Sequence, residues 1–307
     1  MQQLLIDDDL QPQIKPQQAL QTDDSESILR FALEAMEADS AAVLVTLVEI
    51  RGGAARALGA QMVVREDGRY CGYVSGGCVE AAAAYEALQV IATGKDRFVR
   101  YGEGSPYLDI VLPCGGGITL AFHQLRDAQP LRNVLDLLAK RQPAALRYLP
   151  TFQRLASAAC TEITGWQEDA FITGYLPKTR VAVYGRSVEA LATASIAQAA
   201  GYEVLSGEDV QAQAVDPLTA VILLYHDLDR ELPVLLAALR SAPFYIGALG
   251  SRRTHATRVK KLLSLGFSEE EIARIKAPIG IFAQARDART LALSIVADVA
   301  AARLNVV

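Results

Sequence analysis

Two glycine–cysteine motifs lie in the first half of the chain. One reads Ser75-Gly76-Gly77-Cys78-Val79-Glu80, and the other reads Pro113-Cys114-Gly115-Gly116-Gly117. Glycine permits positive φ and lets a ligand approach the main chain closely. Each cysteine adds a soft sulfur, and Glu80 adds a charge. Two such turns in one domain indicate a site for a ligand with phosphate and sulfur or metal character.

The cysteines also fit a plainer interpretation, because free cysteine is often a small buried residue. For Cys78 and Cys114 the sequence leaves ligand contact and core packing both open. Cys71 and Cys160 lack the multiple-glycine context, so we predict that they are packing residues. The chain has no C-x-x-C pair, and its three histidines share no metal-ligand spacing. We therefore predict neither a structural zinc site nor another protein-bound metal centre.

A third glycine turn, Gly250-Ser251-Arg252-Arg253-Thr254, follows an expected strand and opens an expected helix. Backbone N–H groups at a helix start bind anions. The guanidinium groups of Arg252 and Arg253 can hold phosphate through paired hydrogen bonds. We predict an anion site here, with Ser251 adding a hydroxyl. The alternative is a capped helix with solvated arginines.

Residues 181–200 have the strand–turn–helix order of a dinucleotide-binding fingerprint. The full pattern is G-x-G-x-x-G/A, and this chain places Gly185, Ser187 and Ala190 at its three positions. Serine in the middle adds a Cβ where the backbone would approach a pyrophosphate. Glu208 and Asp209 are candidates for the ribose-binding acid. Both nucleotide binding and a purely structural helix start remain open for this turn.

Length and charge narrow the class of protein. A chain of 307 residues favours two domains. A net charge of −5 argues against nucleic-acid binding by bulk electrostatics. No apolar run is long enough to span a bilayer, and the first 24 residues lack the apolar core of a secretory signal. Four cysteines without an export signal favour a reducing cytoplasm.

The pattern of apolar residues predicts an α/β fold in two domains. We expect a disordered lead over residues 1–24, a domain with β-hairpins over 25–150, a linker over 151–178 and a second domain over 179–307. In the first domain, helices are expected at 25–38, 79–93 and 131–141, with strands at 42–50, 61–65, 70–74, 108–112 and 118–124. In the second, strands at 180–184, 203–205, 220–225 and 244–249 alternate with helices. This alternation predicts a parallel, doubly wound sheet.

Taken together, the motifs resemble the XdhC/CoxI family of molybdenum-cofactor insertion chaperones, over nearly the whole chain. The segments that carry the resemblance are Arg51-Gly52-Gly53, Gly59-Ala60, Met62, Gly68, the motif 75–80, the turn 114–117, His226-Asp227, Leu239-Arg240-Ser241, residues 245–254 and Ala277-Pro278-Ile279-Gly280. The resemblance implies an N-terminal α/β XdhC/CoxI domain and a C-terminal Rossmann-like domain.

It also implies a function. The chain would be a non-enzymatic maturation factor that binds the molybdenum cofactor, as molybdopterin or its nucleotide-extended form. It would protect the sulfurated cofactor and insert it into a molybdenum hydroxylase of the xanthine dehydrogenase or aldehyde oxidoreductase type. Further partners would be a cysteine desulfurase or a cofactor nucleotidyltransferase, and a second copy of the chain. The implied site residues are Ser75, Gly76, Gly77, Cys78, Glu80, Cys114, Gly115, Gly116, Gly185, Ser251, Arg252 and Arg253.

The second domain departs from the family pattern at three places. Relatives usually show a G-A-G-H turn where this chain has Gly185-Arg186-Ser187-Val188, and they carry an Asp-Arg pair that residues 205–209 do not keep. The run Ile281-Phe282-Ala283-Gln284 replaces an acidic, glycine-containing segment. Two rival interpretations stay open, although the altered Gly185 fingerprint speaks against the first. One is an NAD(P)-dependent oxidoreductase, and the other is a scaffold that docks a molybdoenzyme without binding its cofactor.

Overall fold

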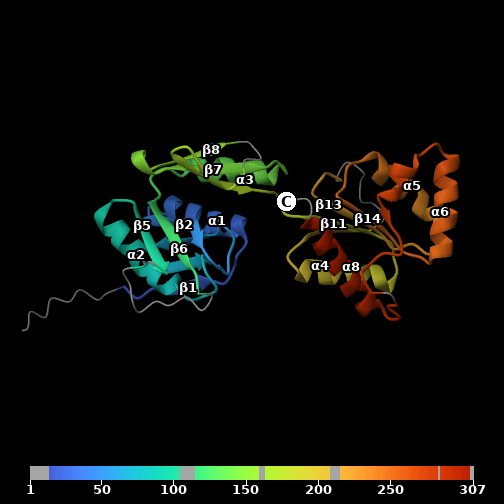
Figure 1. The fold of residues 1–307 in the computed structure, drawn as a ribbon, viewed down its shortest axis with the longest axis horizontal. Helices are drawn as coiled ribbons and strands as arrows, with labels where there is room; N and C mark the ends of the chain where they lie inside the picture. The colour runs from blue at the N-terminus through green and yellow to red at the C-terminus, as the bar shows by residue number, and fades with distance from the viewer. Residues whose placement is uncertain are drawn as a thin grey trace, which may run out of the picture. The chain divides into compact units, whose positions relative to one another are not determined.

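The computed structural model describes residues 14–103, 105, 115–158, 163–207, 215–282 and 284–304. The chain divides into two compact units, Met1–Pro177 and Lys178–Val307, shown from blue to green and from yellow to red in Figure 1. Each unit is an α/β structure with its own sheet and core. The prediction of an α/β chain with a parallel second sheet is confirmed.

The first unit is built on a six-stranded mixed sheet with the order β1-β4-β3-β2-β6-β5. Its strands and two covering helices are β1 (Gln17–Leu20), α1 (Ser25–Glu37), β2 (Ala42–Arg51), β3 (Gln61–Arg65), β4 (Arg69–Gly72), α2 (Glu80–Thr93), β5 (Arg97–Gly102) and β6 (Gly117–Gln124). β3 and β4 form an antiparallel hairpin, and β2 is antiparallel to both β3 and β6. The strand expected at 108–112 lies outside the described residues, and β5 was not predicted.

Strand β2 shows why this sheet is buried on both faces. Leu44 and Val48 point into the core beneath α1, whereas Val43, Val45 and Leu47 point into the core beneath α2. Successive strand side chains face opposite sides, so a continuous apolar run needs cover on both. The apolar run therefore places α1 and α2 on opposite faces of the sheet.

The segment expected to be a linker, residues 151–178, is instead mostly sheet. α3 (Gln129–Ala139) leads into β7 (Ala144–Leu149), the short 3-10 helix η1 (Pro150–Phe152), β8 (Arg154–Ala158), β9 (Gly165–Gln167) and β10 (Ala170–Tyr175). These strands form an antiparallel sheet with the order β8-β7-β10-β9. Tyr148, Leu155 and Phe171 share a core with α1 and β2, so this second sheet is an integral layer of the first unit.

The expected lead also contains structure. β1 runs parallel to β4 at the edge of the six-stranded sheet, so residues 17–20 are not disordered. Residues 1–13 lie outside the described part of the chain. Asp24, rather than Ser25, caps α1, and its carboxylate accepts a hydrogen bond from the Ser27 backbone N–H at 3.0 Å.

The second unit is a doubly wound parallel sheet with the order β12-β11-β13-β14-β15. Its elements are β11 (Arg180–Tyr184), α4 (Val188–Ala199), β12 (Glu203–Ser206), β13 (Thr219–Leu223), α5 (Leu228–Arg240), β14 (Tyr245–Ala248), α6 (Arg252–Ser264), α7 (Glu269–Ala273), β15 (Ile275–Lys276) and α8 (Ala288–Arg303). Alternate strand residues pack against α4 and α8 on one face and against α5, α6 and α7 on the other. This layering positions the loops that follow β11, β13 and β14 at one edge of the sheet.

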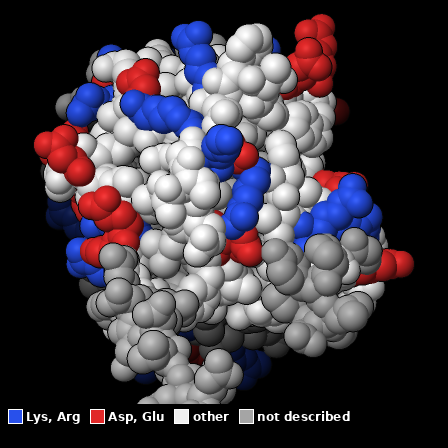
Figure 2. All heavy atoms as spheres, turned by 90° about the vertical axis from the view of Figure 1, so that its left-hand side faces the viewer, with Lys and Arg blue, Asp and Glu red and all other residues white. Residues whose placement is uncertain are grey.

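Charged side chains of both signs occur side by side on the face shown in Figure 2, which views the molecule from the left-hand side of Figure 1. Such a mixed surface does not offer the single-sign field that attracts a polyanion. Within the described part of the chain, none of the helices combines the length and the hydrophobicity that a membrane crossing requires.

Candidate functional site

The first glycine–cysteine motif forms the loop between β4 and α2. Its Glu80 carboxylate is buried, with only 3 % of the residue exposed. One carboxylate oxygen accepts the backbone N–H groups of Val74 at 3.0 Å and Ser75 at 2.7 Å. The other accepts the Ser75 hydroxyl at 2.7 Å and the Val79 N–H at 3.3 Å. Glu80 therefore clamps both ends of the loop to the start of α2.

This clamp presents Cys78 to solvent. The Cys78 N–H donates to the Ser75 hydroxyl oxygen at 3.1 Å, and its free thiol lies on an exposed residue. Gly76 and Gly77 beside it are also exposed. Gly77 has φ of +103°, a conformation that favours glycine. By contrast, Cys71 is buried, and burial raises the pKa of its thiol to about 12. Of these two cysteines, Cys78 is the one placed to contact a ligand.

The second motif is described from Gly115 onward, and Cys114 lies outside the described residues. Gly115 is exposed with φ of +68°. Gly116 is buried against the end of β2 and the segment that follows it. A Cβ on Gly116 would lie 2.5 Å from the Arg51 carbonyl oxygen and closer still to that of Gly53. Glycine is therefore required at position 116 by the approach of two backbones.

Residues 51–56, which we name the bridging loop, connect the two motifs. Besides the contact with Gly116, the loop places the Ala55 Cβ 3.4 Å from where a Cβ on Gly76 would lie. The Arg56 Nε donates to the Ser75 carbonyl oxygen at 3.3 Å. The motifs at 75–80 and 115–117 therefore lie on either side of one short segment.

Within the described residues, no group of three or more His, Cys, Asp or Glu side chains could hold a metal ion. The Cys78 loop presents an exposed thiol beside exposed glycine backbone.

In the second unit, the predicted turns meet at the carboxyl edge of the parallel sheet, where open α/β sheets bind ligands. Gly185 follows β11, His226 and Asp227 follow β13, and Ser251 follows β14. β13 lies between β11 and β14. A Cβ on Gly185 would lie 2.7 Å from the Leu224 carbonyl oxygen, so glycine lets the first loop approach the end of β13.

The helix that follows Gly185 already has an acidic group of its own at its start. Ser187 caps α4 and accepts the Ala190 N–H at 3.4 Å. The pKa of Glu189 is lowered by a hydrogen bond from Ser187, by one from the backbone N–H of Glu189 itself, and by nearby His226. An ionised Glu189 disfavours a pyrophosphate at this helix start, because like charges repel. Glu208 and Asp209 lie outside the described residues.

The start of α6 has the opposite character. Ser251 caps the helix and accepts the Thr254 N–H at 3.2 Å, and the first turn contains no acid. Arg252 and Arg253 are both exposed in that turn. Of the two turns predicted to bind phosphate, this one has two exposed arginines and no acid in the first turn of its helix, whereas the first turn of α4 contains Glu189.

A buried ion pair holds the loops after β13 and β14 together. Arg258 of α6 pairs with Glu231 of α5 at 2.5 and 2.9 Å, and both side chains are almost fully buried. Arg258 also donates to the Leu249 carbonyl oxygen at 2.9 Å, directly before the Gly250 turn. Burial and the adjacent Arg258 lower the pKa of His255. No sequence pattern indicates this pair, because its members lie on different helices.

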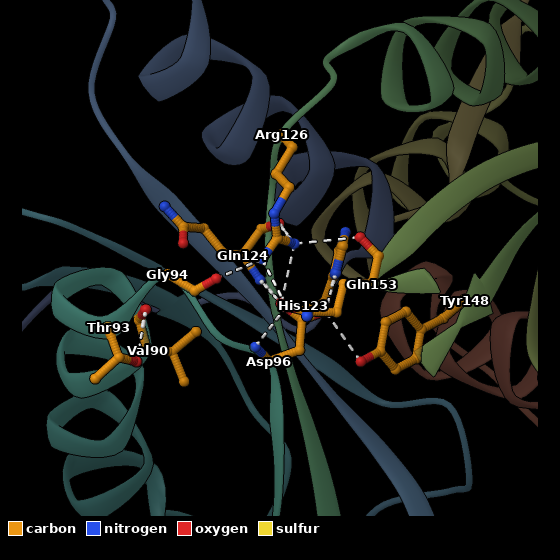
Figure 3. Close-up of polar contacts among 9 residues, drawn as sticks. All are labelled: Val90, Thr93, Gly94, Asp96, His123, Gln124, Arg126, Tyr148 and Gln153. Carbon is orange, nitrogen blue, oxygen red and sulfur yellow. Dashed lines mark hydrogen bonds and ion pairs between the residues drawn. The ribbon is translucent and has the colours of Figure 1, made fainter. Parts of the chain in front are cut away.

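A second cluster that the sequence did not indicate centres on Asp96 (Figure 3). Its carboxylate accepts bonds from His123 Nδ1 at 2.5 Å, the Tyr148 hydroxyl at 3.0 Å, the Gln124 N–H at 3.1 Å and Arg126 at 3.0 Å. Burial would raise the pKa of Asp96, but the hydrogen bond and charge of His123, with the bonds from Gln124 and Arg126, lower it. Because Tyr148 lies on β7 and His123 on β6, the cluster joins the two sheets of the first unit.

A cavity of about 10 Å³ lies beside this cluster, between the two sheets. Its polar lining comes from Thr46, Gln61, His123, Tyr148 and Thr173. The cavity is about large enough for one water molecule. It is therefore too small for a cofactor, and the cluster is better explained as a structural connection between sheets.

Comparison with known proteins agrees with this architecture. The family model described as "XdhC and CoxI family" matches residues 35–102, and the "XdhC Rossmann domain" model matches residues 181–299. The molybdenum cofactor insertion chaperone PaoD of Escherichia coli (strain K12) is 60 % identical over 294 residues, which cover 95 % of this chain and 92 % of PaoD.

Two more distant proteins match most of the length of this chain. A Bacillus subtilis (strain 168) protein, named as a probable subunit of xanthine dehydrogenase, is 22 % identical over 88 % of this chain and 96 % of its own length. A crystal structure from Bacillus halodurans, described as a xanthine dehydrogenase, superposes with a TM-score of 0.71. It is 20 % identical and covers 90 % of this chain and 96 % of its own, which shows the common fold. The chain belongs to the XdhC/CoxI family.

Proposed function

We propose that this chain is a chaperone that binds the molybdenum cofactor and inserts it into a molybdoenzyme of the xanthine dehydrogenase or aldehyde oxidoreductase type. The observation that carries the proposal is the 60 % identity, over nearly the full length of both chains, with a protein named as a molybdenum cofactor insertion chaperone. The exposed Cys78 loop supports it, because a soft sulfur on a glycine-rich turn suits a cofactor that brings its own metal. In this proposal the chain is a maturation factor rather than an enzyme.

Each unit carries candidate cofactor contacts of its own. We propose that Cys78 and Cys114 lie near the metal or its sulfido group, with Ser75, Gly76, Gly77, Gly115 and Gly116 forming the surrounding backbone. Glu80 would keep the loop in shape through its clamp on Ser75 and Val79.

Ser251, Arg252 and Arg253 would hold the terminal phosphate or nucleotide end. The acid-free first turn of α6 supports this choice over the Gly185 turn, whose helix begins with Ser187 and Glu189. Gly185 would contribute by bringing the loop after β11 close to Leu224 at the same edge.

The partners follow from the cargo. We propose that a molybdenum hydroxylase receives the cofactor, that a cysteine desulfurase or cofactor nucleotidyltransferase acts before delivery, and that the chain works as a homodimer. We place it in the cytoplasm, because the free thiols of Cys71 and Cys78 fit a reducing compartment.

The first test is equilibrium binding of the purified protein to isolated molybdenum cofactor, with the nucleotide-extended cofactor and NADH as parallel ligands. We expect one of the two cofactor forms to bind and NADH not to bind. Binding of NADH alone would replace the chaperone proposal with an oxidoreductase. Absence of any binding, with the molybdoenzyme still recovered as a partner, would favour a scaffold.

Variants then test the assigned residues. We expect Cys78→Ala combined with Cys114→Ala to weaken cofactor retention, whereas Cys160→Ala, which removes a thiol outside both motifs, retains it. We expect Arg252→Ala combined with Arg253→Ala to weaken binding and to reduce its dependence on salt, because screening acts on the charges that are removed. Unchanged retention in either double variant would remove the role assigned to that pair.

A further inference from the structure

The bridging loop, residues 51–56, touches both glycine motifs of the first unit but contains none of the residues assigned to the cofactor. At its end, the Arg56 guanidinium makes three contacts. It donates to the Ser75 carbonyl oxygen at 3.3 Å and pairs with the Asp23 carboxylate at 2.7 Å. It also lies over the Tyr73 ring, 5.3 Å from its centroid. Arg56 therefore binds the Cys78 loop from a separate segment of the chain, whereas Glu80 binds it from within the same motif.

At its start, the same loop holds the second motif through its backbone. Gly116 packs so closely that a Cβ there would lie 2.5 Å from the Arg51 carbonyl oxygen. The Arg51 side chain extends the contact, because it donates to the Glu103 carbonyl oxygen at 3.2 Å beside Gly117. A displacement of Gly116 therefore has to move the bridging loop or the strand that carries it.

We propose that the bridging loop is a positioning element of the cofactor site, which sets the place of the Cys78 loop relative to the Gly115–Gly117 turn. Arg56 is its positioning residue, and it acts on Cys78 through the Ser75 carbonyl. Only the identity of the ligand rests on the proposed function. The mechanical coupling of Gly116 to Cys78 is a property of the protein alone.

The coupling can be measured without any ligand. The rate of alkylation of Cys78 by iodoacetamide, followed by peptide mass spectrometry in the full-length protein, reports on the immediate surroundings of this one thiol. The variants are Arg56→Ala, Arg56→Lys and Gly116→Ala. Arg30→Ala is the matched control, because it removes an arginine whose ion pair with Glu26 involves no residue of either motif or of the bridging loop.

We expect Arg56→Ala and Gly116→Ala to change the Cys78 rate several-fold, although Gly116 is distant in sequence from Cys78, because residues 51–56 contact both motifs. Arg56→Lys should lie between Arg56→Ala and the wild type. It keeps the charge near Asp23 but lacks the fork that serves two acceptors at once. Arg30→Ala should react at the wild-type rate.

Two results would overturn the inference. One is a wild-type rate in folded Arg56→Ala and Arg56→Lys, which remain informative if Gly116→Ala does not fold. The other is a lower thermal midpoint for Arg56→Ala without a change in the alkylation rate of Cys78, since that marks a purely structural role.

Binding of molybdenum cofactor is measured on the same proteins. Altered Cys78 rates without cofactor binding in the wild type would contradict the proposed function and leave the coupling in place.

Discussion

Removal of the Asp96 carboxylate is predicted to weaken the contact between the two sheets of the first unit. In Asp96→Ala, four donors lose their acceptor, and two of them, on His123 and Tyr148, are buried. Arg126 is 38 % exposed and can be hydrated instead. Since leaving a buried donor without a partner costs about 1–3 kcal/mol and two such donors remain, we expect a loss of roughly 2–6 kcal/mol in the free energy of unfolding. That is a large share of the ~5–15 kcal/mol typical of a domain.

The single tryptophan makes the first unit separately measurable. Trp166 lies on β9, and its indole N–H donates to the Val48 carbonyl oxygen of β2 at 3.1 Å. Its fluorescence during urea unfolding therefore reports on the joined sheets. Glu37→Ala is the control, because its ion pair with Arg132 is exposed and such pairs contribute about 0–1 kcal/mol. An Asp96→Ala midpoint equal to that of the control would refute the reasoning.

The pH dependence provides a second check on the same residue. The pKa of Asp96 is lowered in the folded state, so its unfolded state binds a proton more readily. The stabilisation is therefore fully present above the unfolded value of about 4 and is lost as pH falls through the folded pKa. We expect the stability difference between wild type and Asp96→Asn to stay constant near neutral pH and to shrink in acid. A difference that grew on acidification would contradict this sign.

Two further predictions concern the second unit, whose unfolding can be followed by circular dichroism. Arg258→Met should destabilise it by about 3–5 kcal/mol by leaving Glu231 buried without a partner, and the double variant with Glu231→Leu should recover part of that loss. A double variant less stable than Arg258→Met would contradict this. Gly185→Ala should cost about 1–3 kcal/mol, because φ is +137° and the new Cβ would lie 2.7 Å from the Leu224 carbonyl oxygen. An unchanged thermal midpoint would count against the steric role of this glycine.

Much of the fold could be predicted from local pattern. β3 and β11 have the predicted bounds, and α2 ends at Gly94, which adopts φ of +67° as a helix-terminating glycine does. Alternating strands and helices in the second unit allow few arrangements, because parallel strands need covered crossovers. These features follow from the periodicity of apolar residues, from turn residues and from continuous apolar runs, all of which lie within short windows of sequence.

The sheet β8-β7-β10-β9 could not be predicted in the same way. β9 has three residues, too few to show a period, and Pro143 and Pro150 interrupt the pattern around β7. What makes these segments strands is pairing, such as Tyr148 with Phe171, between residues that are distant in sequence. Backbone hydrogen bonds to a partner strand stabilise short strands whose own propensity is weak.

The sequence by itself determined the family, the two-domain α/β organisation and the residues that are chemically able to contact a cofactor. The tertiary structure alone decided how those residues are held. Glu80 closes the Cys78 loop, the bridging loop carries Arg56 to Ser75, and Asp96 joins two sheets. Whether a residue is chemically able to contact a cofactor depends on its side chain and on its neighbours in the sequence. Burial, pairing and distance arise only when segments far apart in sequence pack together.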